Sequence, residues 1–168
     1  MNNKTGLNRK YTSPSIAAII KAGLFAGTLD ILSAFLYGYI NSGIHPEVIL
    51  QYISTTAFGK TAFNEPLMFT ITGLLVHFAI AMGWTVLFFI LYRYLKLMRL
   101  NRIITGTVYG LFIWTVMNMI LLPVWNDKAF VFKPVPSTIN ALILIIAIGL
   151  PLSFIAWAAY REKEKTSS

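Results

Sequence analysis

Residues 16–40, IAAIIKAGLFAGTLDILSAFLYGYI, decide the fold of this chain. The stretch is long enough to cross a bilayer, because about 20 apolar residues rising about 1.5 Å each cover a hydrocarbon core of about 30 Å. Gly23 and Gly27 form a G-x-x-x-G motif, and Asp30 lies near the middle of the stretch. At roughly 100° per residue these positions share one narrow stripe of the helix with Ala34 and Tyr37. We therefore expect the other helices to assemble against this stripe.

The composition is that of a membrane protein. The chain has 168 residues, of which 57% are hydrophobic and 12% charged, about half the charged fraction of a soluble domain. The net charge of +8 lies between and outside the apolar stretches, so it predicts membrane topology and no nucleic-acid partner. Because the chain has no cysteine, disulfides, a thiolate nucleophile and a Cys-based metal site are excluded.

The apolar pattern predicts an all-α polytopic membrane protein, with residues 1–168 forming a single integral membrane domain. We expect a bundle of four transmembrane helices at about residues 16–40, 66–92, 103–125 and 138–160. A short external amphipathic helix is expected at about residues 46–58, between Pro46 and Gly59. It would lie in the interface or cover one end of the bundle; a re-entrant or gating element is the alternative. Pro151 predicts a kink in the fourth span.

The distribution of Lys and Arg predicts the orientation. The N-terminal segment carries three, the turn at 93–102 four and the C-terminal tail three, which makes ten, whereas the two other connections carry only Lys60, Lys128 and Lys133. Both termini and the basic turn are therefore expected in the cytoplasm. The N-terminal segment superficially resembles a signal peptide, but the following apolar run is too long and Lys21 interrupts it, so we expect an uncleaved first span.

Asp30 is the only acid inside a predicted span. An acid near mid-membrane costs a few kcal/mol, so it should face protein or water, be paired, or be protonated. His77 in the second span lies at a similar depth, roughly 15 Å below the outer boundary, and a contact between the two is predicted. The pair would either sense protons or coordinate a solute, or it would only fix the register of the helices.

Three other features are expected to act in packing. Gly106 and Gly110 form a second G-x-x-x-G, and both motifs allow close helix contact within the bundle or between copies of the chain. Asn118 is expected to hydrogen-bond between helices, with a solute-binding role as the alternative. Trp84 and Trp114 are expected to pack inside, although they could also stack against a flat ligand.

Enzymatic chemistry finds no support in the sequence. Two histidines, one of them in a loop, form neither a haem site nor a zinc triad. The chain has no H-E-x-x-H, no G-x-S-x-G and no phosphate-binding glycine loop. We therefore predict a protein that is not an enzyme and has no cofactor and no metal.

The layout resembles a group of uncharacterised bacterial inner-membrane proteins that includes the YagU-like proteins. The shared features are a first span with small residues, an external segment, a second span with a histidine (His77 in GLLVHFAIAMGW), a short basic turn and two more spans. The external segment is short for that group. The resemblance implies a bacterial inner membrane and leaves the activity open. Small multidrug transporters also have four spans and an acid in the first, but their spans are shorter and the acid is Glu, so only the layout is comparable.

Two functions follow from these observations. The first is a membrane protein that handles or senses a small solute or protons through Asp30 and His77. The alternative is a structural or accessory subunit that packs through its glycine faces against a second copy or another membrane protein, with the lipid bilayer as its surroundings. An open, polar cavity at Asp30 and His77 would favour the first function, and a dry, closed contact the second.

Overall fold

This computed structural model describes residues 14–59, 65–126 and 131–166, and most of these residues are helical. No β-strand occurs in these ranges, which confirms the predicted all-α class. The elements are α1 (Ile16–Ser42), α2 (Pro46–Phe58), α3 (Pro66–Tyr94), the 3₁₀ turn η1 (Leu97–Arg99), α4 (Arg102–Thr115), the π-helical η2 (Val116–Leu121), α5 (Leu122–Asn126), α6 (Pro134–Leu144), the π-helical η3 (Ile145–Gly149) and α7 (Leu150–Thr166).

Four of these helical segments are long and apolar enough to cross a membrane, as predicted: Ile16–Ser42, Pro66–Tyr94, Arg102–Trp125 and Pro134–Tyr160. The fourth begins four residues before the expected boundary at 138. Pro134 occupies the first helical turn, where its missing N–H has no partner to lose. The backbone N–H of Lys133 donates to Ser137 Oγ at 3.3 Å and so fixes this start. The helix expected over 46–58 is present as α2.

Two π-helical segments interrupt the third and fourth spans. Each ends two residues before a proline, η2 before Pro123 and η3 before Pro151. A proline removes one backbone hydrogen bond and crowds the preceding turn, and a π turn widens the helix at that place. At Pro151, where the sequence predicts a kink, the structure has the π turn η3 just before the proline; the kink itself stays a prediction.

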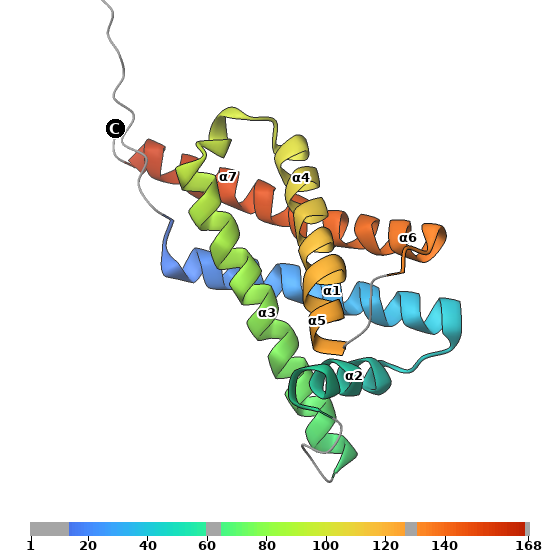
Figure 1. Ribbon diagram of the computed structural model, residues 1–168. Helices are drawn as coiled ribbons and strands as arrows, with labels where there is room; N and C mark the ends of the chain where they lie inside the picture. Colours follow the sequence, from blue (N-terminus) through green and yellow to red (C-terminus); the bar gives the residue numbers. More distant parts are fainter. Residues whose placement is uncertain (1–13, 60–64, 127–130, 167–168) are drawn as a thin grey trace, which may run out of the picture.

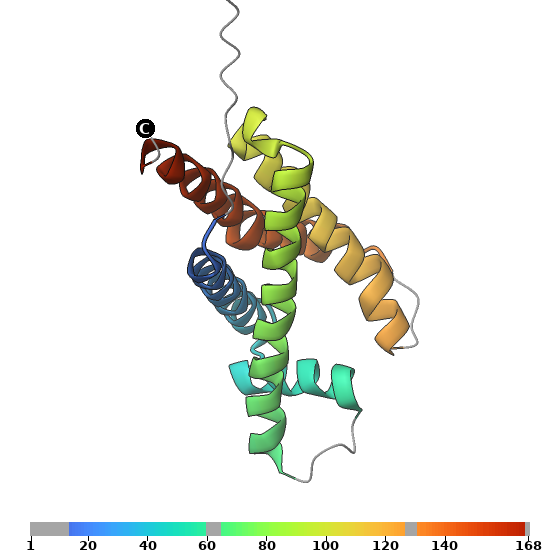
Figure 2. The same cartoon turned by 90° about the vertical axis from the view of Figure 1, so that its left-hand side faces the viewer.

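The four spans are arranged as two crossing pairs (Figures 1 and 2). Helix α1 runs beside the α6–α7 segment, while α3 and α4 leave the η1 turn and spread apart. Helix α1 packs against α3, η3 and α7, and α4 packs against η3 and α7. Helix α2 packs across α3, and its Leu50 carbonyl lies so close to Gly73 that a Cβ at this glycine would overlap it.

An aromatic cluster joins α3, α4 and α7 near the η1 turn. The Phe88 and Tyr109 rings are 4.6 Å apart between centroids, and the Tyr92 and Tyr160 rings stack at 5.4 Å. The Tyr109 hydroxyl donates to the Trp84 carbonyl, which ties α4 to α3. Such aromatic pairs stabilise beyond the area that they bury, so this cluster holds the three helices together near the η1 turn.

Candidate functional site

A cavity of about 130 Å³ lies in the gap between α3 and α4. Helix α1 and the π turn η3 border it on one side, and α2 and α5 border the end away from η1. Most of its wall is aliphatic: Ile53, Ala57, Val76, Ile80, Ala81, Ile113, Met117, Leu122, Leu144 and Ile148. The polar and aromatic lining residues are Asp30, Tyr52, Thr56, His77, Trp84 and Trp125. An apolar cavity with a few convergent polar groups is typical of a ligand site.

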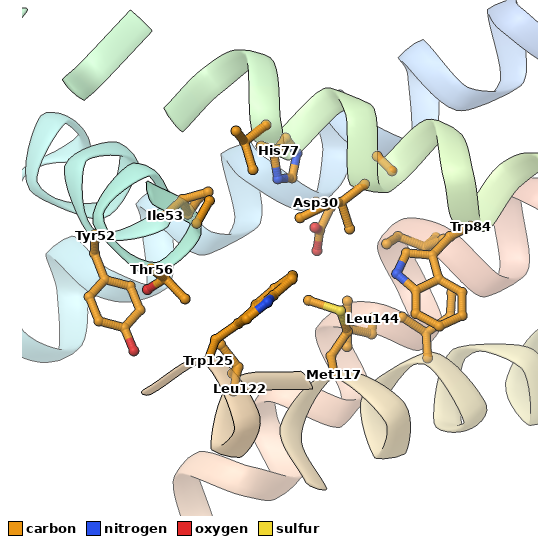
Figure 3. Close-up of a pocket in the computed structure, with 16 residues that line it drawn as sticks. Asp30, Tyr52, Ile53, Thr56, His77, Trp84, Met117, Leu122, Trp125 and Leu144 are labelled. Atoms are coloured by element: carbon orange, nitrogen blue, oxygen red, sulfur yellow. The ribbon is translucent and has the colours of Figure 1, made fainter. Parts of the chain in front are cut away.

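Among the described residues Asp30 contributes the only carboxyl group to this wall, and Figure 3 shows it directed into the cavity. Its position follows from the stripe of small residues on α1. Gly23 lies against Met82 and Thr85 of α3, and Gly27 lies against Phe78 and Ala81. The two helices are close along this face, so the carboxyl one turn further on faces protein and the cavity instead of lipid.

His77 lies beside Asp30 in the cavity wall (Figure 3). Its hydrogen bond, however, is made to a backbone carbonyl of α1 and not to Asp30. Its Nε2 donates to the carbonyl oxygen of Gly27 at 2.9 Å, across the α1–α3 contact. No hydrogen bond joins the side chains of His77 and Asp30 among the described residues, although both line the same cavity. Because Nε2 carries a proton, a neutral ring has Nδ1 free of its proton and able to accept a hydrogen bond.

The mouth of the cavity lies at α2 and α5. Tyr52 and Trp125 are 54% and 44% exposed, whereas His77 on the inner wall is 9% exposed. Between mouth and floor, the Thr56 hydroxyl oxygen is buried and has no hydrogen-bond partner among the described residues. The described lining therefore includes one carboxyl, one imidazole and the hydroxyls of Thr56 and Tyr52, and a ligand would enter past the aromatic rings of Tyr52 and Trp125.

Asn118 does not line this cavity. It lies on η2, where its Nδ2 donates to the Asn140 Oδ1 at 3.2 Å and to the Trp114 carbonyl at 3.0 Å. The residue thus joins the third span to the fourth, as its packing interpretation predicts, and it stays away from the solute site that was the alternative.

We expect the Asn118–Asn140 pair to show a measurable coupling energy. In a double-mutant cycle of Asn118→Ala and Asn140→Ala, unfolding in mixed micelles should give a coupling of about 0.6 to 1.7 kcal/mol, the range for polar contacts between spans. The matched control is the cycle of Asn118→Ala with Thr138→Ala, because Thr138 is exposed on the same helix α6. Equal coupling in the two cycles would contradict the role of the hydrogen bond.

The glycine motifs lie at helix contacts inside the chain. A Cβ on Gly106 would come within 2.8 Å of the Gly149 carbonyl oxygen, and one on Gly110 within 2.6 Å of Ile145 Cα. These atoms belong to the backbone of η3, so the third and fourth spans are in direct backbone contact. Gly23 and Gly27 also lie at a contact with another span, but there they meet side chains of α3, those of Phe78, Ala81, Met82 and Thr85.

Four residues of the site region were not singled out from the sequence. Tyr52 and Thr56 belong to the apolar face recognised at 46–58, but the pattern does not tell what that face covers. Trp125 follows Pro123 at the end of a span, where an interfacial position is the usual interpretation. Asn140 could have been found, because a carboxamide within an apolar run is the same signal that identified Asn118.

The described residues contain no group of three or more His, Cys, Asp or Glu side chains that could hold a metal ion. Asp30 and His77 together supply two ligands, fewer than the three protein ligands of a catalytic zinc site. The chain matches no protein-family model, no curated protein and no solved structure.

Proposed function

We propose that this chain is a membrane protein that binds a small organic cation in the cavity of Asp30 and His77 and catalyses no reaction. The observation that carries the proposal is the direction of the Asp30 carboxyl, which points into an otherwise apolar cavity. A carboxylate in such a place is unfavourable alone and gains most from a ligand of opposite charge. The protein would handle or sense that solute.

The aromatic residues support a cation over other solutes. Trp84 and Trp125 line the cavity on two sides of the carboxyl, and an indole face attracts a cation through its quadrupole. An ammonium group can donate to the Asp30 carboxylate, to Nδ1 of neutral His77 and to the Thr56 hydroxyl. The volume of about 130 Å³ is close to that of an apolar cavity of about 150 Å³ that holds benzene. A ligand with one ring and one ammonium group therefore fits.

The two π turns add a second line of support. Met117 of η2 and Ile148 of η3 both line the cavity. Single π turns inside α-helices are frequent at functional sites. Here one residue of each π turn lines the same cavity.

We further propose a four-helix bundle in a bacterial inner membrane, with both termini and the η1 turn in the cytoplasm and α2 outside. The excess of Lys and Arg at the termini and at residues 93–102 supports this orientation. In Figure 2 the C-terminal end of α7 and the η1 turn lie toward one side, and α2 and the end of α5 lie toward the other. The cations Lys4, Arg9, Lys10, Lys60 and Lys128 are part of this count and lie outside the described residues. The cavity would then open outward.

The alternative, an accessory subunit that packs through its glycine faces, has less support. Gly23, Gly27, Gly106 and Gly110 all face other helices of the same chain. A partner would have to use a different surface.

Benzylammonium and benzyl alcohol test the proposal, because they have the same shape and differ in charge. We expect the full chain in mild detergent to bind benzylammonium at least tenfold more tightly, since a single charge-assisted contact contributes about 1.5 kcal/mol or more. Isothermal titration calorimetry measures both constants, and tryptophan fluorescence reports on Trp84 and Trp125. Equal affinity for the two compounds, or no binding of benzylammonium, would overturn the proposed function.

A further inference from the structure

A second cavity, of about 250 Å³, lies at the other end of the gap between α3 and α4. It shares no lining residue with the solute cavity, and the hydrogen bond from Tyr109 to Trp84 joins α3 and α4 between the two. Its walls come from the last turn of α3, from the η1 turn and from the first three turns of α4. Leu95, Leu100, Ile104 and Val108 line it and are more than half exposed. The cavity is therefore a groove that faces the hydrocarbon of the bilayer, if the chain spans the membrane as proposed.

The groove ends at a turn that carries exposed cations. Lys96 and Arg99 are exposed and alternate with Leu95, Leu97 and Leu100, which line the groove. The turn has a defined backbone: the Arg99 N–H donates to the Lys96 carbonyl at 3.1 Å and the Leu100 N–H to the Leu97 carbonyl at 3.0 Å. The sequence has no acid between residues 66 and 126. The positive charge of this turn is therefore not neutralised by a carboxylate of the same hairpin.

Arg102 differs from these two cations. Its guanidinium carbon lies 3.9 Å from the ring centre of Trp157 and 4.9 Å from that of Phe154. Both rings belong to α7, so this charge is directed away from the groove. Lys96 and Arg99 are thus the cations of the groove's end.

Thr105 lines the groove and is only 6% exposed. Its hydroxyl oxygen is buried and has no hydrogen-bond partner among the described residues, so it adds no accessible polar surface to the groove. The accessible wall of the groove is therefore apolar, and the charges lie only at its end.

We propose that this groove binds an anionic phospholipid of the membrane. One acyl chain lies along the leucine and isoleucine side chains, and the phosphate headgroup lies at Lys96 and Arg99. The apolar groove and the cations at its end match the acyl chain and the headgroup of such a lipid. A second copy of this chain would satisfy the apolar walls but not the cations.

Native mass spectrometry of the full chain in mild detergent tests this site, with phosphatidylglycerol and phosphatidylcholine of identical acyl chains as the probes. Each cation near the membrane surface is worth about fivefold in affinity, so we expect a preference of about 25-fold for phosphatidylglycerol. The double variant Lys96→Gln/Arg99→Gln should bring the preference close to one.

The matched control is Lys21→Gln/Lys133→Gln, which removes the same charge from exposed positions on other elements. It should keep the preference of the unmodified chain. Equal retention of the two lipids by the unmodified chain would overturn the proposal, and so would an equal loss in the control variant, since the charge would then act from a distance. A stable dimer that retains neither lipid would assign the groove to a second copy and also overturn it. None of these outcomes depends on benzylammonium binding at the other cavity.

Discussion

Replacing Gly149 by alanine should destabilise the protein by about 3 kcal/mol, the upper end of what an added methyl group costs in a packed interior. A Cβ at this position would overlap the carbonyl oxygen of Gly106 and come within 3.0 Å of the Gly110 backbone nitrogen. Both atoms belong to the backbone of α4, so a side-chain rotation cannot relieve the overlap. The α4 helix would have to move away from η3. Unfolding in mixed micelles, followed by circular dichroism, measures the loss.

The chain supplies a matched control in Gly83→Ala. Gly83 lies inside α3, and a Cβ there meets no atom of the described residues within 4 Å. Alanine favours a helix over glycine by up to about 1 kcal/mol, so this variant should be neutral or slightly more stable. Equal destabilisation by the two substitutions would mean that the backbone contact between the third and fourth spans does not hold the fold together.

The positions of the spans could be predicted from the sequence because their signal is local. Length and hydropathy define a span without reference to its neighbours, and a proline or glycine marks its end. Residues Pro66 and Gly43 act in this way: Pro66 is in the first turn of α3, and Gly43 after α1 has φ +63 and donates its N–H to the Tyr39 carbonyl at 2.9 Å. The helix α2 was found by the same local reasoning.

The neighbours of each span could not be predicted with the same success. A transmembrane helix is apolar toward lipid and toward protein, so its pattern does not tell which face meets another helix. The close contact of Gly73 with the Leu50 carbonyl depends on where α2 folds back, and nothing in the sequence fixes that. The Asn118–Asn140 hydrogen bond could not be predicted either. Each asparagine stands out in its apolar stretch, but the sequence does not show that the two side chains pair.

The candidate site is an intermediate case. The stripe of Gly23, Gly27 and Asp30 indicated that the carboxyl faces protein, and the depth of His77 indicated its neighbour. The sequence did not predict the hydrogen bond from His77 to the Gly27 carbonyl. The helical pattern gives no reason to expect that a side chain donates to a carbonyl inside another helix. It is available because Gly27 has no side chain to cover it.

Replacing Asp30 by asparagine should weaken benzylammonium binding by about 30-fold or more and leave benzyl alcohol binding within about threefold. The substitution keeps the size of the side chain and removes its charge, and loss of one partner from a buried charge pair costs about 2 kcal/mol or more. The variant should fold at least as well as the unmodified chain, because an amide in a span is less costly than a carboxylate. Isothermal titration calorimetry with both compounds measures the two effects separately.

Glu47→Gln is the matched control for this substitution, since it removes the same charge from an exposed position on α2 that does not line the cavity. Its affinity for benzylammonium should stay within about twofold of the unmodified chain, because an exposed charge at the surface is screened by salt. If Asp30→Asn weakened the binding of benzylammonium and of benzyl alcohol to the same extent, the cavity itself would have changed shape. Unchanged benzylammonium binding would show that the carboxyl, although directed into the cavity, does not bind the ammonium group, and the proposal for the whole site would then be wrong.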